Sequence, residues 1–306
     1  MISVYGKLPI SKEYLRHNCH DGLPLRFRDW MDRGFDHASH RSLLPPGREA
    51  RRVYYAGPRE LGGALSVMAP SNDASGTREF PFAVLVPDRR PVNGEGRFAA
   101  LDDVWSGIEG LFDALQREPD NDAFFARVRD AEDLTGEGEP VTEAVSVVLP
   151  WVERLFRFDP VDLFVRALWR LRVLRPHLDQ PEPGHQRIRV PIDRTLPLGP
   201  QLDVWRTLLG HLHPLFERAP SVFAPRSVSA NRPKPGSAWV VFGEPRADDF
   251  GAALGGEMGE SRGVDLVDNE GRLPVDGFSD FRERLEAGPL REGADVDELV
   301  RFELAR

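Results

Sequence analysis

The segment ALSVMAPSNDASGTREFPFAVLVP, residues 64–87, holds two apolar runs separated by a polar, turn-forming stretch. The runs at 64–69 and 80–86 are short and bounded by Gly, Pro or Asn-Asp, which predicts two strands. Pro70-Ser71-Asn72-Asp73 is typical of an Asx or ST turn, in which short polar side chains satisfy backbone amides. Gly76 can adopt a positive φ and close that loop. This segment therefore indicates a sheet with a well-defined connection.

Further strands are expected on both sides of this segment. Ile2–Tyr5 reads as a strand that enters a turn at Gly6 and Pro9. Short strands are also predicted at residues 51–57, 188–192 and 238–242. Two stretches without periodicity, 181–187 and 232–236, are rich in proline and predict exposed loops.

Helices are predicted where apolar residues recur at three- and four-residue spacing. The first follows Pro24, includes Trp30 and Gly34, and is ended by Pro45-Pro46-Gly47. A second covers 101–115 and includes Trp105. Others are expected at 122–131, 141–156, 159–175 and 202–216. Because Trp30 and Trp105 lie in apolar stripes, both are predicted to be core residues.

The alternation of strands and helices indicates an α/β fold, with a mixed β-sheet and helices on both faces in a three-layer sandwich. We interpret residues 1–306 as a single α/β domain with a helical insertion at 97–180. Asp102-Asp103 and Asp248-Asp249 begin helical segments and are expected to serve the helix N-termini rather than catalysis.

The composition excludes several classes of protein. With 41% apolar and 29% charged residues the chain is that of a globular protein, and its net charge of −9 argues against nucleic acid as a partner. The single Cys19 permits no intramolecular disulfide. The sequence shows neither a signal peptide nor an apolar run long enough to span a bilayer, so we expect a cytoplasmic protein without membrane insertion.

An enzymatic alternative depends on a group of metal-competent side chains near the N-terminus. A metal-dependent hydrolase could use the side chains of His17, Cys19, His20, Asp21, His37 and His40. No His-Glu-x-x-His or paired-cysteine spacing supports such a site, and surface histidines are the preferred interpretation. Ser71 lacks the glycine pair of a nucleophile elbow, and Gly6-Lys7 lacks the rest of a P-loop. We therefore predict no catalytic residue, no metal and no cofactor.

Two segments carry a resemblance to a known family. YGKLPISKEYLR, residues 5–16, resembles the opening of the TagF (ImpM) family, which has a Gly-Lys-Leu-Pro turn followed by a Gly-Asp-Phe triplet; here the triplet is Lys12-Glu13-Tyr14. Residues 64–87 resemble the family's strand, Met-Pro-Ser-x-Asp-x-x-Gly-Arg-x-Phe-Pro-Leu turn and next strand. The departures are Ala69 before Pro70, one extra residue before Phe80 and a basic residue displaced to Arg78. SAWVVFGEP, residues 237–245, is a weaker third match.

The resemblance implies a non-catalytic regulator that represses a Gram-negative type VI secretion system after translation. The implied partners are a forkhead-associated scaffold protein and the pathway of a Ser/Thr kinase and phosphatase. Two alternatives stay open at this point. They are the metal-dependent hydrolase and a structural component of a secretion baseplate.

Both matching segments fall on loops that leave strands, where binding residues concentrate. We therefore expect a partner-binding surface on the loops 7–14 and 71–79. The alternative is that these loops only close the sheet, with Asp73 satisfying turn amides. The hypothesis names as partner-binding residues Lys7, Lys12, Glu13, Tyr14, Ser71, Asp73 and Arg78.

Overall fold

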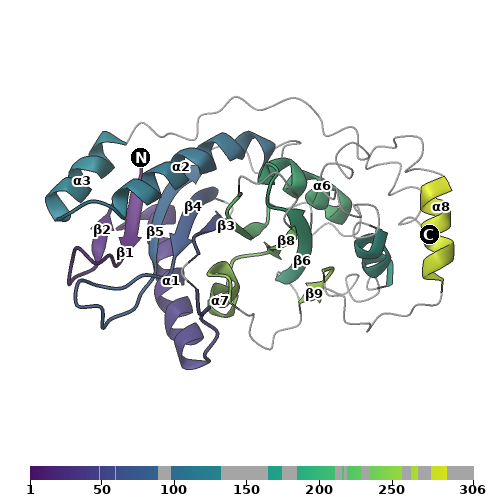
Figure 1. Ribbon diagram of the computed structural model, residues 1–306, viewed down its shortest axis with the longest axis horizontal. Helices are drawn as coiled ribbons and strands as arrows, with labels where there is room; N and C mark the ends of the chain where they lie inside the picture. The colour runs from purple at the N-terminus through teal and green to yellow at the C-terminus, as the bar shows by residue number, and fades with distance from the viewer. Residues whose placement is uncertain are drawn as a thin grey trace.

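The computed structural model describes residues 1–47, 49–58, 60–88, 98–131, 165–173, 185–210, 216, 219–228, 235–256, 263–267 and 277–287. The strands are β1 (Ser3–Gly6), β2 (Leu15–His17), β3 (Arg51–Ala56), β4 (Gly63–Ala69), β5 (Phe82–Asp88), β6 (Gln186–Asp193), β7 (Ser221–Pro225), β8 (Pro235–Phe242) and β9 (Val264–Asp265). They form one open sheet of nine strands in the order β2-β1-β5-β4-β3-β7-β8-β6-β9 (Figure 1).

The sheet is mixed, as predicted. Each neighbouring pair is antiparallel except β6 and β9, which run parallel. The β4–β5 pair, which holds the segment at 64–87, lies within the sheet and shares the longest register of its N-terminal half. Both strands are almost wholly buried, which explains why they read as near-continuous apolar runs rather than alternating ones.

Helices cover both faces of this sheet. They are α1 (Gly22–His40), α2 (Asp102–Leu115), α3 (Asn121–Asp130), α6 (Leu198–Gly210), α7 (Phe250–Ala253) and α8 (Phe278–Ala287), with short 3₁₀ turns η1 (Ala99–Leu101) and η3 (Ala247–Asp249). Figure 1 shows α2, α3 and α6 on one side of the sheet and α1 with α7 on the other. Two separate apolar cores lie between these layers. The predicted α/β sandwich is therefore confirmed.

The helical stripes seen in the sequence are the buried faces of α1 and α2. Trp30 of α1 is 1% exposed and Trp105 of α2 is 0% exposed, so the prediction that both are core residues is confirmed. Gly34 of α1 permits a close approach, because a Cβ there would lie 2.4 Å from the Cβ of Phe250 in α7. Each stripe faces a different core, which places the two tryptophans on opposite faces of the sheet.

Two buried aspartates cap each other's helical segments. Asp102, at the start of α2, accepts hydrogen bonds from the backbone amides of Leu198 and Gly199 at the start of α6. Asp203, within α6, accepts from the amides of Phe98 and Ala99 just before α2. The amides at a helix start lack partners within the helix, so each carboxylate satisfies two of them. The expectation that Asp102 serves a helix N-terminus is confirmed. It does so at the start of α6 as well as at the start of α2, the helix to which it belongs.

Several boundaries differ from the sequence-based expectations. Residues 186 and 187, predicted as part of an exposed loop, begin the buried strand β6. The burial of Arg187 depends on its pairing with the distant Asp248 and Asp249, so hydropathy gave no signal for it. Likewise β8 begins at Pro235, inside the predicted loop. The short strands β2 and β9 and the buried strand β7 were not predicted.

Other predictions fall partly outside the described residues. The helix at 141–156 and the start of the helix at 159–175 lie there, whereas residues 165–173 are helical. The described residues within 97–180 are mainly helical, and α2 packs directly on β4 and β5. The single-domain organisation stays a prediction. No helix in the described ranges is long and apolar enough to cross a membrane.

Candidate functional site

The two loops that carry the matching motifs meet at one end of the sheet. We call this region, residues 7–14 and 71–79, the two-loop surface. The amide of Ala74 donates to the carbonyl of Ser11 at 2.9 Å, and the guanidinium of Arg78 donates to the carbonyl of Lys12 at 2.5 Å. Segments more than 50 positions apart in the sequence thus form a continuous surface.

Gly6 makes this junction possible. Its φ of 134° lies in a region that favours glycine, and a Cβ would stand 2.0 Å from the carbonyl oxygen of Pro81. The glycine that opens the first motif therefore lets β1 pack against the proline of the second. The close packing of these two segments therefore explains why Gly6 is a glycine and why Pro81 lies opposite it.

Asp73 is the polar centre of the two-loop surface. Its carboxylate accepts from the amide and hydroxyl of Ser75 and from the Arg78 guanidinium, and Lys7 Nζ lies 3.6 Å from Asp73 Oδ2. The hydrogen bond from Ser75, reinforced by Arg78, holds the pKa of Asp73 far below its ordinary value. Gly76 has a φ of 70°, as its place in the turn predicted. The expected Asx turn is confirmed.

The structure corrects the expected exposure of two partner-binding residues. The side chain of Lys7 is 3% exposed and that of Asp73 is 0% exposed, so neither presents its charge to a partner. They were expected at the surface because a charged residue in a loop is usually solvated. A lysine and an aspartate that pair across two loops can both be buried, since each supplies the counter-charge that burial requires.

The remaining members of the predicted set are accessible. Lys12, Glu13 and Arg78 are exposed, while Tyr14 and Ser71 are half-buried. The ring of Tyr14 stacks on Tyr5 with centroids 5.6 Å apart, and Lys7 Nζ lies 4.8 Å from the Tyr14 centroid.

Arg16, which sequence reasoning did not select, is also exposed and lies over the same ring, with its guanidinium carbon 5.4 Å from the centroid. The sequence signal that could have identified Arg16 was its position in the first motif, two residues after Tyr14. The accessible part of the two-loop surface thus combines an aromatic ring with three cationic side chains, those of Lys12, Arg16 and Arg78.

A small apolar cavity of about 90 Å³ lies at the foot of the second loop. Its lining includes Phe35 from α1, the Pro45-Pro46-Gly47 run, and Ser71 and Glu79 from the loop. This proline run was predicted to end the first helix, but α1 already ends at His40. The two-loop surface therefore continues into a shallow apolar recess.

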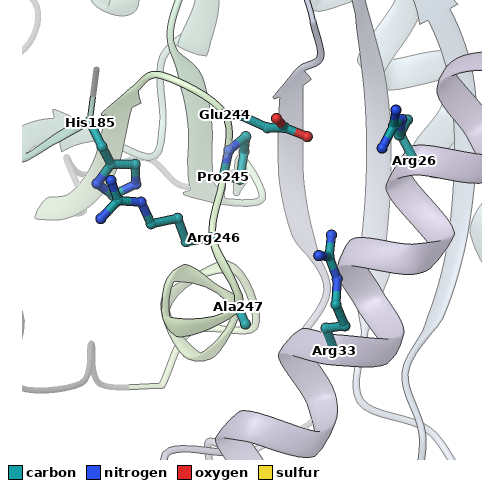
Figure 2. A pocket seen from close by; sticks show the side chains of 7 residues that line it. All are labelled: Arg26, Arg33, His185, Glu244, Pro245, Arg246 and Ala247. Atoms are coloured by element: carbon teal, nitrogen blue, oxygen red, sulfur yellow. The ribbon is translucent and has the colours of Figure 1, made fainter. Parts of the chain in front are cut away.

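A second candidate site is a basic pocket of about 460 Å³ between α1 and the segment before η3 (Figure 2). Its charged lining residues are Arg26 and Arg33 of α1, with Glu244 and Arg246 opposite. Figure 2 shows the two α1 arginines on the side of the helix that faces Glu244. Three guanidinium groups against one carboxylate give this pocket a positive balance on a chain whose net charge is −9.

A buried polar network forms one wall of the basic pocket. His185 Nε2 lies 3.1 Å from Asp249 Oδ2, Arg187 pairs with both Asp248 and Asp249, and the amide of Arg246 donates to Asp249. No serine, threonine or cysteine lines the pocket among the described residues, so the His185–Asp249 pair has no nucleophile to activate there. The network fixes the loop rather than assembling a catalytic triad.

The N-terminal histidines and Cys19 do not form a shared site. In the described part of the chain, no group of three His, Cys, Asp or Glu side chains is placed to hold a metal ion. Cys19 is buried, with its sulfur 3.2 Å from the carbonyl oxygen of Val4 and 3.1 Å from that of His17. Burial raises the pKa of this thiol to about 11, which keeps it protonated and unreactive at neutral pH.

Comparisons with known proteins were made at the level of sequence and of fold. No family model and no curated protein matches the chain. The fold is similar to the crystal structure of PA0076 from Pseudomonas aeruginosa PAO1, with a TM-score of 0.44 and 17% sequence identity over 86% of this chain and 97% of that chain. This similarity concerns architecture and assigns the chain to no family.

Proposed function

We propose that this protein is a non-catalytic, TagF-like regulator that represses a bacterial type VI secretion system by binding other proteins. The proposed partner is the forkhead-associated scaffold protein of that system, which acts with a Ser/Thr kinase and phosphatase. The proposal rests on the resemblance of residues 5–16 and 64–87 to the family's motifs.

The observation that carries the proposal is the meeting of these two motifs in the two-loop surface. Arg78 of the second motif donates to the Lys12 carbonyl of the first, and Ala74 donates to Ser11. Backbone loops held by a rigid sheet are favourable binding elements, because little ordering entropy is lost when a partner docks. A composite surface of this kind suits protein recognition.

The buried and the exposed residues of the two-loop surface have different roles in this proposal. Lys7 and Asp73 hold the loops together from within. Lys12, Glu13 and Arg78 present charge to the partner, and Tyr14 supplies an aromatic contact of the type enriched at interface centres. Opposite charges on the partner would then speed association and fix its orientation.

The test is a pulldown of the forkhead-associated scaffold with purified wild type and two charge-reversal variants, Lys12→Glu and Arg78→Glu. The matched control is Arg127→Glu on α3. Arg78 and Arg127 have equal side-chain exposure of 53%, and each pairs with one carboxylate, Asp73 and Glu118 respectively. We expect the two loop variants to weaken binding about tenfold or more, and the control to retain it.

Stability must be measured on the same samples, because the loops could serve only to close the sheet. If a loop variant melts at a lower temperature but its folded fraction binds the scaffold as tightly as the wild type, the recognition role of the two-loop surface is refuted. Equal losses of binding in Arg127→Glu would show a non-specific charge effect and contradict the proposal in the same way.

A further inference from the structure

A third cavity, of about 910 Å³, lies on the α7 side of the sheet, away from the two-loop surface. Its walls come from the start of β3, from β6 and β8, from residues 42–46 after α1, and from Gly255 and Gly256 after α7. Figure 1 shows α7 beside β8 and β6 on this side of the sheet. The cavity is larger than the two described above.

Arg51, the first residue of β3, contributes a guanidinium to this cavity without a partner. Its Nε is buried and forms no hydrogen bond, and no ion pair involves this side chain within the described part of the chain. Burial, together with the neighbouring Arg194 and Arg189, lowers the pKa of Arg51 to about 10. The residue as a whole is half-buried, and a partly desolvated cation without a counter-ion is unfavourable, so proteins normally pair or hydrogen-bond such groups.

The charged groups around Arg51 do not satisfy it. Glu49, the nearest acid to influence it, is bonded to Arg194, and Asp265 lies 3.1 Å from Arg189 Nη1. Among the described residues, three arginines thus share two carboxylates, and both carboxylates are bonded to arginines other than Arg51. Within this set, one positive charge is left over beside the cavity.

The rest of the lining suits an organic molecule that carries an anionic group. Trp239 presents an aromatic ring, over which Arg189 lies with its guanidinium carbon 5.9 Å from the centroid. The hydroxyl of Ser237 accepts from Arg189 Nε at 2.9 Å and can donate its own proton to a ligand. Guanidinium and hydroxyl donors beside an aromatic face are the elements of a site for a small organic oxyanion.

We propose that this cavity binds a small organic molecule through an oxyanion, a phosphate or a carboxylate, that pairs with Arg51. Trp239 contacts the uncharged part of the ligand, and Ser237 and Arg189 supply further donors. The site is independent of the proposed regulatory function, since it shares no residue with the two-loop surface.

The experiment is a calorimetric titration of the purified full chain, in chloride buffer of constant ionic strength, with three probes: inorganic phosphate, AMP and citrate. Each is raised to about 10 mM, so that sites of millimolar affinity become occupied. Phosphate and citrate separate a phosphate site from a carboxylate site, and AMP adds a planar ring that Trp239 can contact. We expect saturable 1:1 binding of at least one probe. If no probe binds, the proposal is wrong.

The decisive variant is Arg51→Gln, which removes the charge and keeps a polar side chain. We expect the affinity for the binding probe to fall about tenfold or more, as expected for a lost charge-assisted hydrogen bond. Unchanged affinity would overturn the proposal. Arg26→Gln, in the basic pocket of Figure 2, tests the rival site, and a larger loss there than in Arg51→Gln would also overturn it.

Thermal melting gives an independent readout. Without a probe, Arg51→Gln should melt at or above the temperature of the wild type, because the substitution removes an unpaired buried charge. With the probe, the melting temperature of the wild type should rise and that of the variant should not. Marked destabilisation of the probe-free variant would show that Arg51 already has a structural partner and would refute the proposal. Arg51→Lys, which keeps the charge but lacks the planar fork, should also bind the probe more weakly than the wild type does.

Discussion

The two tryptophans at the centres of the two cores differ in one respect that mutagenesis can measure. Trp30 Nε1 donates to the carbonyl of Arg246 at 2.9 Å, and its ring contacts Phe223 and Phe250. Trp105 is equally buried, but its Nε1 has no acceptor among the described residues. Substitution of each by Phe therefore removes one satisfied and one unsatisfied N–H, and an aromatic ring at position 105 still faces the Arg52 guanidinium, whose carbon lies 5.7 Å from the Trp105 centroid.

The expected magnitudes follow from this difference. At both positions the smaller ring leaves a void, whose cost is similar and largely cancels in the comparison. Trp30→Phe also leaves the Arg246 carbonyl without its donor, which costs about 1 to 3 kcal/mol. Trp105→Phe removes a buried N–H that had no partner. The variant therefore regains part of the free energy that this unpaired group costs the wild type, a cost of comparable size. We expect Trp30→Phe to be less stable than Trp105→Phe by at least about 1 kcal/mol.

The measurement is urea unfolding of both variants and of the wild type, followed by circular dichroism, with equal m-values as the condition for comparing midpoints. The matching Ala variants are the controls: both add a cavity cost of about 3 to 5 kcal/mol, and they should show the same difference between the two positions, because they remove the same two N–H groups. Equal destabilisation by the two Phe substitutions would refute the reasoning, because it would mean that the indole N–H groups have the same environment.

Two further predictions concern buried charge. Lys7→Met should destabilise the protein by clearly more than the roughly 0.5 kcal/mol typical of surface changes, because the side chain is 3% exposed and faces the Asp73 carboxylate; a thermal melt indistinguishable from wild type would contradict this. Burial raises the pKa of Asp203 from its ordinary 3.8 to about 6, so the folded state holds this proton more tightly than the unfolded chain. The contribution of Asp203 to the free energy of unfolding is then largest below pH 4 and is lost as the pH rises to about 6, by up to about 3 kcal/mol. Asp203→Asn should flatten this slope in unfolding curves measured between pH 4 and 7, and an unchanged slope would show that another group is responsible.

Much of the fold could be read from local patterns. The apolar stripe of α1, with Trp30 and Gly34 on one face, and the apolar runs of β4 and β5 predicted both the element type and its burial. The turn between β4 and β5 was also predictable, because Asp73 and Gly76 are residues whose turn preferences do not depend on distant contacts.

The candidate sites were predictable only in part. The sequence pointed to the loops 7–14 and 71–79, and Lys12, Glu13 and Arg78 are exposed there as expected. It gave no sign that Lys7 and Asp73 would bury each other. The two arginine-lined cavities were missed, since their residues come from segments more than two hundred positions apart.

The sequence by itself determined the strongly patterned helices and strands, such as α1, α2, β4 and β5, and the turn between β4 and β5, because period and turn chemistry act over a few residues. Only the tertiary structure decided which charges are paired. Arg187 lies in a buried strand because Asp248 and Asp249 reach it, and Arg51 faces a cavity because Glu49 and Asp265 are bonded elsewhere. The cost of a buried charge depends on partners that only folding brings within a few ångströms, and local sequence does not contain that information.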